Sequence, residues 1–315
     1  MGKQIERYRQ SEQRLWESVG VTPSERRVQL RTGEMVRVQE TGDGPPVLLV
    51  HGAANAGTSW MSLMAKLPDF RCIALDRPGC GLSDPIVGGP LRDIDAIESY
   101  ADGLLTDVLD ALGLAGAAVL ATSYGGYFAM RGAAANPTRV DSIVEYSWLL
   151  GAPMDRVAMS MRLSALPGMR AMTAKMPVTR TMVKALLRQI GLKRAIETGT
   201  FTEEMIDWFL SVQRDTDTMA NDLRSSPKIV TPVRGLNERM LHTDELLSRV
   251  TMPTLFLWGD EDPNGGELVA RKFVARLPDA QLEIIPRAGH APWIDELELC
   301  ADRTRAFLTA RPSEA

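Results

Sequence analysis

Short apolar runs alternate with longer amphipathic segments along much of this chain, and that alternation restricts the fold more than any other feature. The uninterrupted apolar runs occupy residues 47–50, 72–75, 117–121, 143–144, 254–258 and 282–285. Runs of this kind are typical of strands buried on both faces, and parallel strands need helical crossovers between them. The sequence therefore predicts an α/β fold with an open, doubly wound and mostly parallel sheet.

A helical crossover is visible between the second and third of these runs. Its apolar residues recur every three or four positions: Ile97, Tyr100, Ala101, Leu104, Leu105, Val108 and Leu112. Gly113 follows, and glycine is the residue type that most often ends a helix. Residues 293–308 repeat this spacing, so we expect one further helix that packs an apolar stripe on the sheet.

The first part of the chain has a different pattern. Residues 5–19 place apolar side chains near helical spacing among charged neighbours, which predicts an amphipathic helix. Residues 28–31 and 35–38 alternate apolar with polar side chains around a turn at Gly33. Alternation of period two on both sides of a glycine turn predicts a β-hairpin.

A long middle region, between about residues 150 and 250, breaks the alternation. It shows no strand pattern, and helical segments interrupted by Pro and Gly take its place. Ten of the sixteen methionines lie here: Met154, Met159, Met161, Met169, Met172, Met176, Met182, Met205, Met219 and Met240. Met is unbranched and adaptable, so these residues suit a packed helical core, the interpretation we favour, or the lining of an apolar pocket. The expected division is an N-terminal helix and lead-in over 1–26, an α/β core over 27–149 and 250–315, and a helical insertion over 150–249.

Composition and charge exclude several classes of protein. Lys and Arg total 36 against 40 Asp and Glu, so the net charge of −4 provides no basic surface for nucleic acid. The charged N-terminus lacks the apolar stretch of a signal peptide, and no apolar run reaches the roughly 18 residues of a membrane-spanning helix. We therefore predict a cytoplasmic protein with no nucleic-acid partner and no membrane span.

The cysteines and histidines do not form a metal-binding pattern. Cys72, Cys80 and Cys300 are odd in number and widely spaced, so we expect reduced thiols. No Cys or His lies at zinc-ligand spacing from another, and we predict neither a metal nor a cofactor. We expect His51 to be structural and His242 to be a solvated surface residue.

One segment carries the pattern of a catalytic nucleophile. Residues 119–126 are typical of an apolar strand that enters a turn of small residues and then a helix, with Ser123 at the turn. This is the context of the G-x-S-x-G elbow, in which a serine hydroxyl is exposed at the tip of a sharp turn. Ala121 replaces the first glycine and adds only one methyl group. Ser123 is therefore the candidate nucleophile.

A serine hydroxyl needs a base within hydrogen-bond reach and a carboxylate that orients the base. Asp260 and Asp262 follow one apolar run, and His290 follows the next. Both positions come after predicted strands, at the edge where open α/β sheets place their sites. The residues alone leave the choice between Asp260 and Asp262 open.

Several motifs, taken in order, resemble the α/β-hydrolase family. They are His51-Gly52-Ala53-Ala54, Asp76-Arg77-Pro78-Gly79-Cys80-Gly81-Leu82-Ser83, the Ser123 turn, Gly259-Asp260-Glu261-Asp262 and Gly289-His290, all within residues 45–308. The resemblance implies that Ser123 attacks the substrate and that His290 transfers protons. It also implies that Asp262, rather than Asp260, holds the imidazole.

The resemblance further implies an oxyanion hole made of two backbone N–H groups. One is that of Tyr124, the residue after the nucleophile, and the other is that of Ala53. Because the loop after His51 is long, Ala54 and Asn55 stay open as alternatives to Ala53.

The family implies a serine hydrolase with a helical cap. We predict that it cleaves a carboxylic ester of a small to medium-sized, largely apolar substrate through an acyl-enzyme on Ser123. The nearest enzymatic alternative is a C–C bond hydrolase of the meta-cleavage type, and lactones, thioesters and small amides stay open as substrates. A function of another class is a ligand-binding receptor on the same fold, with slow turnover or none. The expected partner is a small molecule, and a homodimer is compatible with the sequence.

Overall fold

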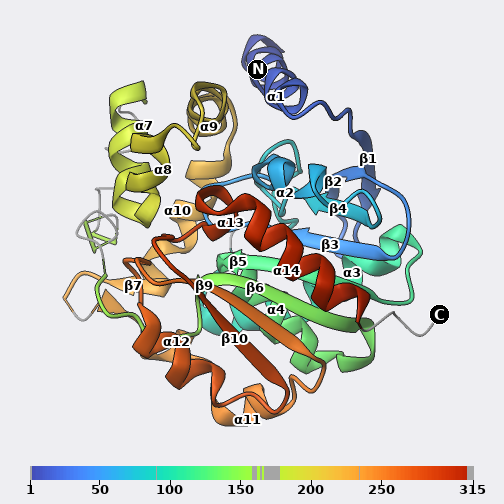
Figure 1. Cartoon of the computed structure of the whole chain (residues 1–315), viewed down its shortest axis with the longest axis vertical. Helices are drawn as coiled ribbons and strands as arrows, with labels where there is room; N and C mark the ends of the chain where they lie inside the picture. The colour runs from blue at the N-terminus through green and yellow to red at the C-terminus, as the bar shows by residue number, and fades with distance from the viewer. Residues whose placement is uncertain are drawn as a thin grey trace.

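An eight-stranded sheet lies at the centre of the computed structural model (Figure 1). The structure describes residues 2–89, 91–157, 162–163, 165–166, 178–233 and 235–310. The order of the strands is β1-β2-β4-β3-β5-β6-β9-β10. Their bounds are β1 Ser24–Gln29, β2 Met35–Thr41, β3 Pro46–Val50, β4 Arg71–Leu75, β5 Ala117–Ser123, β6 Val140–Leu149, β9 Thr254–Gly259 and β10 Ala280–Ile285.

All strand pairs from β4 across to β10 are parallel, whereas β2 is antiparallel to both β1 and β4. Each apolar run of the sequence lies within one of these strands, and the expected hairpin is formed by β1 and β2. The mostly parallel α/β sheet predicted from the sequence is therefore confirmed.

Helices cover both faces of the sheet (Figure 1). They are α1 Gly2–Ser18, α2 Met61–Ala65, α3 Ile94–Leu112, α4 Tyr124–Ala135, α7 Arg180–Leu187, α8 Lys193–Thr198, α9 Glu203–Asp215, α10 Thr218–Ile229, α11 Asp244–Ser248, α12 Glu267–Val274, α13 Pro292–Asp295 and α14 Leu297–Thr309. Shorter helical turns are η1 Gly57–Trp60, η2 Pro137–Arg139, η3 Arg188–Leu192 and η4 Glu238–Met240.

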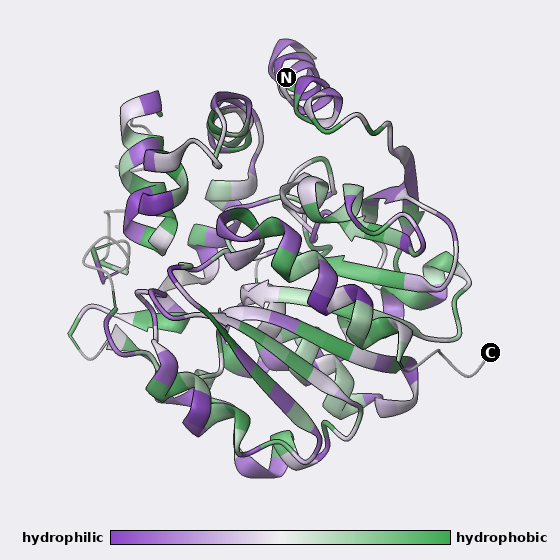
Figure 2. Ribbon diagram, viewed as in Figure 1, coloured by the Kyte–Doolittle hydropathy of each residue, from purple (hydrophilic) through white to green (hydrophobic). Residues whose placement is uncertain are grey.

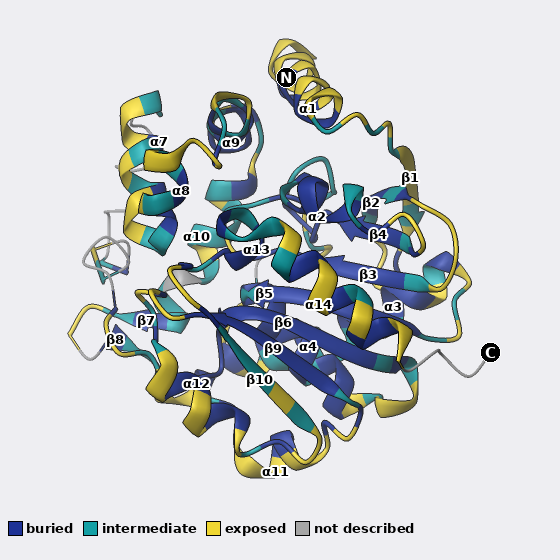
Figure 3. Cartoon of the chain, in the orientation of Figure 1, coloured by how far each residue is buried: buried dark blue, intermediate teal, exposed yellow. Residues whose placement is uncertain are grey.

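Alternate side chains of each strand enter two different apolar clusters. Leu48 and Val50 of β3 pack on the side of α3, α4 and α12, whereas Val47 and Leu49 pack on the side of α2 and α14. All four side chains are almost inaccessible to solvent. Figures 2 and 3 show the result, because the central strands are both the most hydrophobic and the most deeply buried part of the chain. The two-sided burial explains why these strands read as uninterrupted apolar runs.

The helix boundaries agree with the predicted crossover and correct the predicted last helix. α3 ends at Leu112, and Gly113 follows in the left-handed conformation with a φ of 71°. The helix expected over residues 293–308 is two helices, α13 and α14, because Glu296 between them has a non-helical φ of −136°.

The expectation that residues 150–250 hold no strand is wrong. Two very short strands, β7 Val230–Thr231 and β8 Gly235–Leu236, form an antiparallel pair. Each has only two residues, which is too short for alternation to be recognised in a sequence. Helices α7 to α10 of this region lie beyond the ends of β5 and β6 (Figure 1).

Five of the ten methionines between residues 150 and 250 lie within the described residues. Met159, Met161, Met169, Met172 and Met176 lie outside the described residues. Among the others, Met240 is buried and Met182 is 41% exposed. Met154, Met205 and Met219 are half-buried. The described methionines therefore divide between core and surface.

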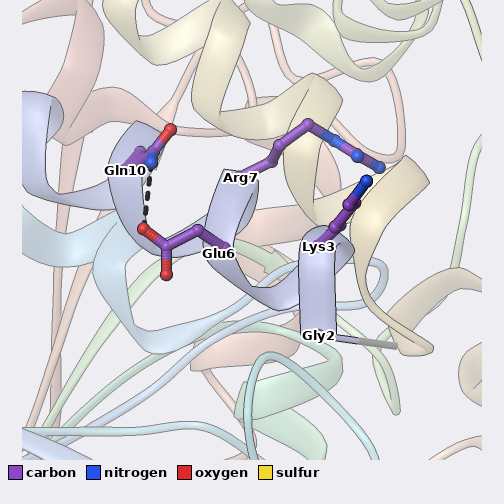
Figure 4. Close-up of a pocket in the computed structure, with 5 residues that line it drawn as sticks. All are labelled: Gly2, Lys3, Glu6, Arg7 and Gln10. Carbon is purple, nitrogen blue, oxygen red and sulfur yellow. Dashed lines mark hydrogen bonds between the residues drawn. The ribbon is translucent and has the colours of Figure 1, made fainter.

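The N-terminal helix α1 contacts both the sheet and α9. Its Glu12 carboxylate receives hydrogen bonds from the buried Arg37 guanidinium and from the Thr58 hydroxyl. Its Arg7 guanidinium pairs with Asp215 at the end of α9. A hollow of about 490 Å³ lies beside the first turns of this helix. Figure 4 shows the residues that line it: Gly2, Lys3, Glu6, Arg7 and Gln10. None of these residues belongs to the predicted site.

Among the residues that the structure describes, no helix combines the length and the apolar character needed to cross a membrane.

Candidate active site

Ser123 lies where β5 passes into α4, and its backbone is strained. Its φ is 57° and its ψ is −121°, a conformation that side chains larger than glycine rarely adopt. Its hydroxyl makes no capping hydrogen bond to the first turn of α4, and the side chain is half-buried. The turn thus holds a serine hydroxyl at the carboxyl edge of the sheet, as the elbow motif predicts.

Two glycines after Ser123 allow this sharp turn. A Cβ atom on Gly125 would lie 2.1 Å from the carbonyl oxygen of Val50. A Cβ atom on Gly126 would lie 2.4 Å from Oε1 of Glu145. Side chains at either position would push α4 away from the sheet. Ala121, in contrast, is fully buried without disturbing the strand, so the first glycine of the motif is dispensable here.

His290 and Asp262 are hydrogen-bonded to each other. The His290 Nδ1 atom lies 2.7 Å from Asp262 Oδ2, and the Asp262 side chain has no exposed surface. A carboxylate only accepts, so Nδ1 carries the proton in this bond and Nε2 is left as the basic nitrogen. The side chain of Asn264 lies 3.3 Å from the same Nδ1. The His290 side chain is 13% exposed.

The rival acid, Asp260, faces solvent and has no hydrogen bond to His290 among the described residues. Asp262 also receives two backbone N–H groups, from Trp148 at 2.9 Å and from Asn264 at 2.9 Å. Three donors therefore hold the Asp262 carboxyl group in one orientation. The geometry favours Asp262 over Asp260 as the partner of His290.

The end of β6 joins the parts of the site, and the sequence did not identify it. Leu150 N–H donates to the carbonyl oxygen of Ser123 at 3.0 Å, and Trp148 N–H donates to Asp262. The hydroxyl of Ser147 donates to the carbonyl oxygen of Gly289, beside His290, and accepts from Gly259 N–H. Ser147 has a φ of 59°, and no glycine or turn motif marks it in the sequence.

Within the described residues, the Ser123 hydroxyl and the His290 imidazole share no hydrogen bond. The structure thus brings the predicted base and acid together and leaves the contact between nucleophile and base unmade. Bonds of this kind are often long without substrate and shorten in the substrate complex.

The predicted oxyanion donors lie on both sides of Ser123. Tyr124 is the first residue of α4, so its N–H has no acceptor within the helix. Gly52 lies against Ser123, since a Cβ atom on it would be 3.0 Å from the Ser123 Cβ and 3.5 Å from Oγ. Ala53 follows Gly52 and is exposed.

Ala54 is unavailable as the second oxyanion donor. Its N–H donates to Oδ2 of Asp222 on α10 at 2.7 Å. Its carbonyl oxygen accepts from Nε2 of Gln213 on α9 at 2.7 Å. Ala54 also has a φ of 52°. The geometry therefore leaves Ala53 as the better of these two candidates, and Asn55 as the remaining alternative.

His51 and Arg77 hold the loop that carries Ala53. The His51 Nδ1 atom donates to the carbonyl oxygen of Gly52 at 2.7 Å, and Nε2 accepts from Arg77 N–H at 3.1 Å. The Arg77 guanidinium donates to the carbonyl oxygens of His51 and Gly52. Complete burial lowers the pKa of His51 well below its usual range, so the ring is neutral. His51 is structural, as expected from the sequence.

A buried carboxyl group beneath Ser123 was also missed. Glu145 on β6 has no exposed surface. Burial raises the pKa of this carboxyl well above its usual range, and the backbone N–H of Ser123 opposes the rise only in part. Glu145 is therefore a neutral acid that fills the space next to Gly126.

The expectation that His242 is a solvated surface residue is wrong. Its side chain is 3% exposed and stacks on Tyr127, with ring centroids 5.0 Å apart. Burial lowers the pKa of His242 to about 3, so this ring too is neutral. A flat ring can stack on an aromatic residue in the core, and nothing in the neighbouring sequence signals this.

No group of three or more potential metal ligands occurs among the described residues. The site is therefore described by its own side chains and backbone groups.

Comparisons with known proteins agree with this architecture. The sequence profile of the alpha/beta hydrolase family matches residues 47–303. An uncharacterized protein of Mycobacterium tuberculosis (strain ATCC 25618 / H37Rv) is 30% identical over 282 residues, which cover 87% of this chain and 78% of the relative. The 2-hydroxy-6-oxononadienedioate/2-hydroxy-6-oxononatrienedioate hydrolase of Cupriavidus pinatubonensis is 26% identical and covers 82% of this chain and 85% of the relative.

Solved structures show the same fold. The carboxylesterase of Bacillus subtilis superimposes with a TM-score of 0.74 at 18% identity, over 97% of this chain and 98% of the esterase. The family profile covers the chain from β3 to α14 and includes every predicted site residue. The chain therefore belongs to the alpha/beta hydrolase family.

Proposed function

We propose that this protein is a serine hydrolase that cleaves a carboxylic ester of a small to medium-sized, largely apolar substrate. The observation that carries the proposal is the 2.7 Å hydrogen bond between His290 and the buried Asp262, at the same sheet edge as the strained Ser123. A serine, a histidine with a free Nε2 and a buried orienting carboxylate are the parts that acyl transfer requires.

In the first half of the reaction, His290 Nε2 takes the proton of the Ser123 hydroxyl as Oγ attacks the ester carbonyl carbon. The carbonyl oxygen becomes an oxyanion and accepts hydrogen bonds from the N–H groups of Ala53 and Tyr124. When the tetrahedral intermediate collapses, the bond to the alcohol oxygen breaks and His290 returns its proton to the leaving alcohol. The acyl group stays on Ser123 as an ester.

In the second half, His290 takes a proton from water, and the hydroxide attacks the acyl carbon. The bond to Ser123 Oγ breaks, and His290 protonates Oγ. The products are the carboxylic acid and the free enzyme. Throughout, Asp262 stays ionised and stabilises the imidazolium that forms in each half-reaction.

We further propose that residues 150–249 form a cap over this edge of the sheet. Three contacts support the proposal: Asp222 and Gln213 bind Ala54, and Gly191 contacts the loop of His290. A cap in this position would limit the size of the acyl and alcohol groups and exclude water from the intermediate. The N-terminal helix over 1–26 would be a separate lead-in, and the cytoplasmic location and a homodimer stay predictions.

The experiment is hydrolysis of short and medium-chain nitrophenyl esters by the wild type and by Ser123→Ala. Loss of a triad nucleophile typically lowers kcat by about 10⁴ to 10⁶. A fluorophosphonate probe should add its mass to the wild type at Ser123 and not to the variant. Unchanged turnover by Ser123→Ala would exclude the mechanism.

A second candidate is a C–C bond hydrolase of the meta-cleavage type, and the 26% identity to the Cupriavidus hydrolase favours it. Faster loss of a vinylogous diketone than of any ester would select that reaction. Ligand-induced thermal stabilisation without turnover of either compound would instead select the receptor function.

A further inference from the structure

A polar cluster joins α10 to the loop of residues 51–57. The carboxylate of Asp222 accepts from Ala54 N–H at 2.7 Å and from the Arg77 guanidinium at 2.9 Å. The side chain of Asp222 is 9% exposed and that of Arg77 is 4% exposed. Charged groups withdrawn from water to this degree are held together firmly, because leaving either one unpaired is costly.

We propose that Asp222 is a positioning residue that couples the docking of α10 to the oxyanion hole. In this proposal, which rests on the proposed serine hydrolase function, Asp222 holds Ala54 so that the preceding N–H, that of Ala53, points to the substrate oxyanion.

The backbone of Ala54 is the physical link. Its φ of 52° is rare for a residue with a side chain, and such a conformation persists only where surrounding contacts impose it. Both peptide groups of Ala54 are held from outside the loop, the N–H by Asp222 and the carbonyl oxygen by Gln213. Without these contacts Ala54 would relax toward negative φ, and that rotation would turn the Ala53–Ala54 peptide, which adjoins the Gly52–Ala53 peptide that carries the donor N–H.

The direction of the Ala53 N–H matters because this group lies next to the Ser123 hydroxyl. Gly52 backs directly onto Ser123, so the next peptide lies beside the hydroxyl that attacks the substrate. A hydrogen bond to an oxyanion weakens steeply with angle and distance, so a small rotation removes most of its effect.

The rest of the loop is held within the α/β core itself. Gly57 N–H donates to Asp76, and the carbonyl oxygens of His51 and Gly52 accept from Arg77. Among the described residues, only Ala54 in this loop has both backbone groups bound by side chains of α9 and α10. The Gly52 carbonyl shares its peptide with the Ala53 N–H. The Arg77 guanidinium that holds this carbonyl is itself paired with Asp222. Asp222 therefore reaches the peptide of the oxyanion donor from two sides, through Ala54 and through Arg77.

The test measures steady-state kinetics of Asp222→Ala, Asp222→Asn and Gln213→Leu on one ester. We expect Asp222→Ala to lower kcat by about 10² to 10³, the usual effect of losing one oxyanion donor, with KM changed less than threefold. Asp222→Asn keeps an oxygen that can accept from Ala54 N–H, so it should recover most of this loss. Gln213→Leu removes the second hold on Ala54 without leaving a charge unpaired, and it should lower kcat by about tenfold.

Thr218→Val is the matched control. Thr218 is the first residue of α10, and its hydroxyl accepts from Gly81 N–H at 2.9 Å, away from Ala54. The control therefore weakens the docking of α10 without touching the loop of residues 51–57, and kcat should stay within about twofold of the wild type. Equal loss of kcat in Thr218→Val and Asp222→Ala would overturn the proposal, since Asp222 would then act only by fastening the helix.

Binding of a trifluoromethyl ketone supplies a readout that a merely structural role would not move. This inhibitor forms an oxyanion on the enzyme, so its affinity should fall in Asp222→Ala and Gln213→Leu in proportion to kcat/KM and stay near the wild-type value in Asp222→Asn. The affinity for the carboxylic acid product should not change. Unchanged inhibitor affinity in Gln213→Leu would contradict the proposal even if Asp222→Ala failed to fold. Activity that survives Ser123→Ala would instead reject the proposed hydrolase function.

Discussion

The two sides of the Ser123 hydroxyl are held by different parts of the chain. On one side, Asp262 and His290 are fixed by backbone groups and by Ser147 at the ends of β6, β9 and β10. On the other side, the loop of residues 51–57 is fixed in part by side chains from α9 and α10. We call these the strand-end half and the loop half of the site.

The difference separates what the fold determines from what the inserted helices determine. The strand-end half depends mainly on hydrogen bonds inside the α/β core, among Ser147, Asp262 and His290 and the strand ends that carry them. The loop half depends on how α9 and α10 pack against the core. Changes in those helices could therefore alter oxyanion stabilisation without disturbing the general base.

The largest expected effect is in the strand-end half. Asp262→Asn should lower kcat by about 10⁴, because an amide favours the wrong tautomer of His290 and cannot stabilise the imidazolium. The matched control is Asp260→Asn, two residues away and exposed, which should leave kcat within about twofold. Measuring kcat for both variants on one ester compares the two carboxylates directly. A larger loss in Asp260→Asn than in Asp262→Asn would reverse the assignment.

The sequence allowed the strand-end half to be predicted because its signals are local. Ser123, Asp262 and His290 each follow an apolar run, and parallel strands bring their carboxyl ends to one edge. The resemblance to the family added the choice of Asp262 over Asp260. The sheet itself was predictable for the same reason, because a strand buried on both faces is an uninterrupted apolar run in the sequence.

The loop half left no such signal. Asp222 binds Ala54 across 168 positions of sequence, and neither residue belongs to a motif that specifies the other. Ser147 adopts a positive φ in a strand that reads as ordinary, and β7 and β8 are too short for a periodic pattern. Contacts between distant segments depend on packing, which periodicity within one segment does not encode.

The second prediction concerns contacts between the inserted helices and the strand-end half, and it compares how strongly each half depends on those helices. Gly191, in η3, is one of the points where these helices contact the strand-end half, and Arg194 of α8 is another, since it donates to the carbonyl oxygen of Arg287. A Cβ atom on Gly191 would lie 2.9 Å from the backbone nitrogen of His290 and 2.8 Å from the Pro263 Cδ. Gly191→Ala should therefore displace the His290 loop and lower kcat by about 10², the usual effect of a 1 Å misplacement.

Gly199→Ala is the control for Gly191→Ala. Gly199 ends α8 with a φ of 79°, so alanine is strained there too, but no atom lies within 4 Å of the added Cβ. Both variants should lose similar stability from the positive φ, and only Gly191→Ala should lose activity. Thermal unfolding and kcat, measured on the same samples, separate the two effects. Equal kcat values would show that the His290 loop keeps its position when a side chain is added at residue 191 of η3.

The smallest expected effect is on how protein stability depends on pH, and it involves one buried histidine in each half. His51 supports the loop half, and His242 packs near the strand-end half, where a Cβ atom on Gly151 would meet its ring at 2.2 Å. The folded protein keeps both rings neutral, with the pKa of His242 lowered to about 3, whereas unfolded histidine titrates near about 6.5. Below about pH 6.5 the unfolded chain therefore binds more protons. The contribution to stability is complete above that pH and is lost as pH falls toward 3.

Each histidine should add up to about 1.4 kcal/mol per pH unit to the slope of the unfolding free energy in this window. His242→Gln removes one of these contributions, so its slope between pH 4 and 6 should be shallower than that of the wild type, whatever its stability at neutral pH. Urea unfolding at several pH values measures the slope directly. Parallel slopes would mean that His242 is protonated in the folded state, which requires solvent to reach the ring stacked on Tyr127. Acid would then destabilise the fold through His51 in the loop half and not through His242, because a ring protonated in both the folded and unfolded states adds nothing to the slope.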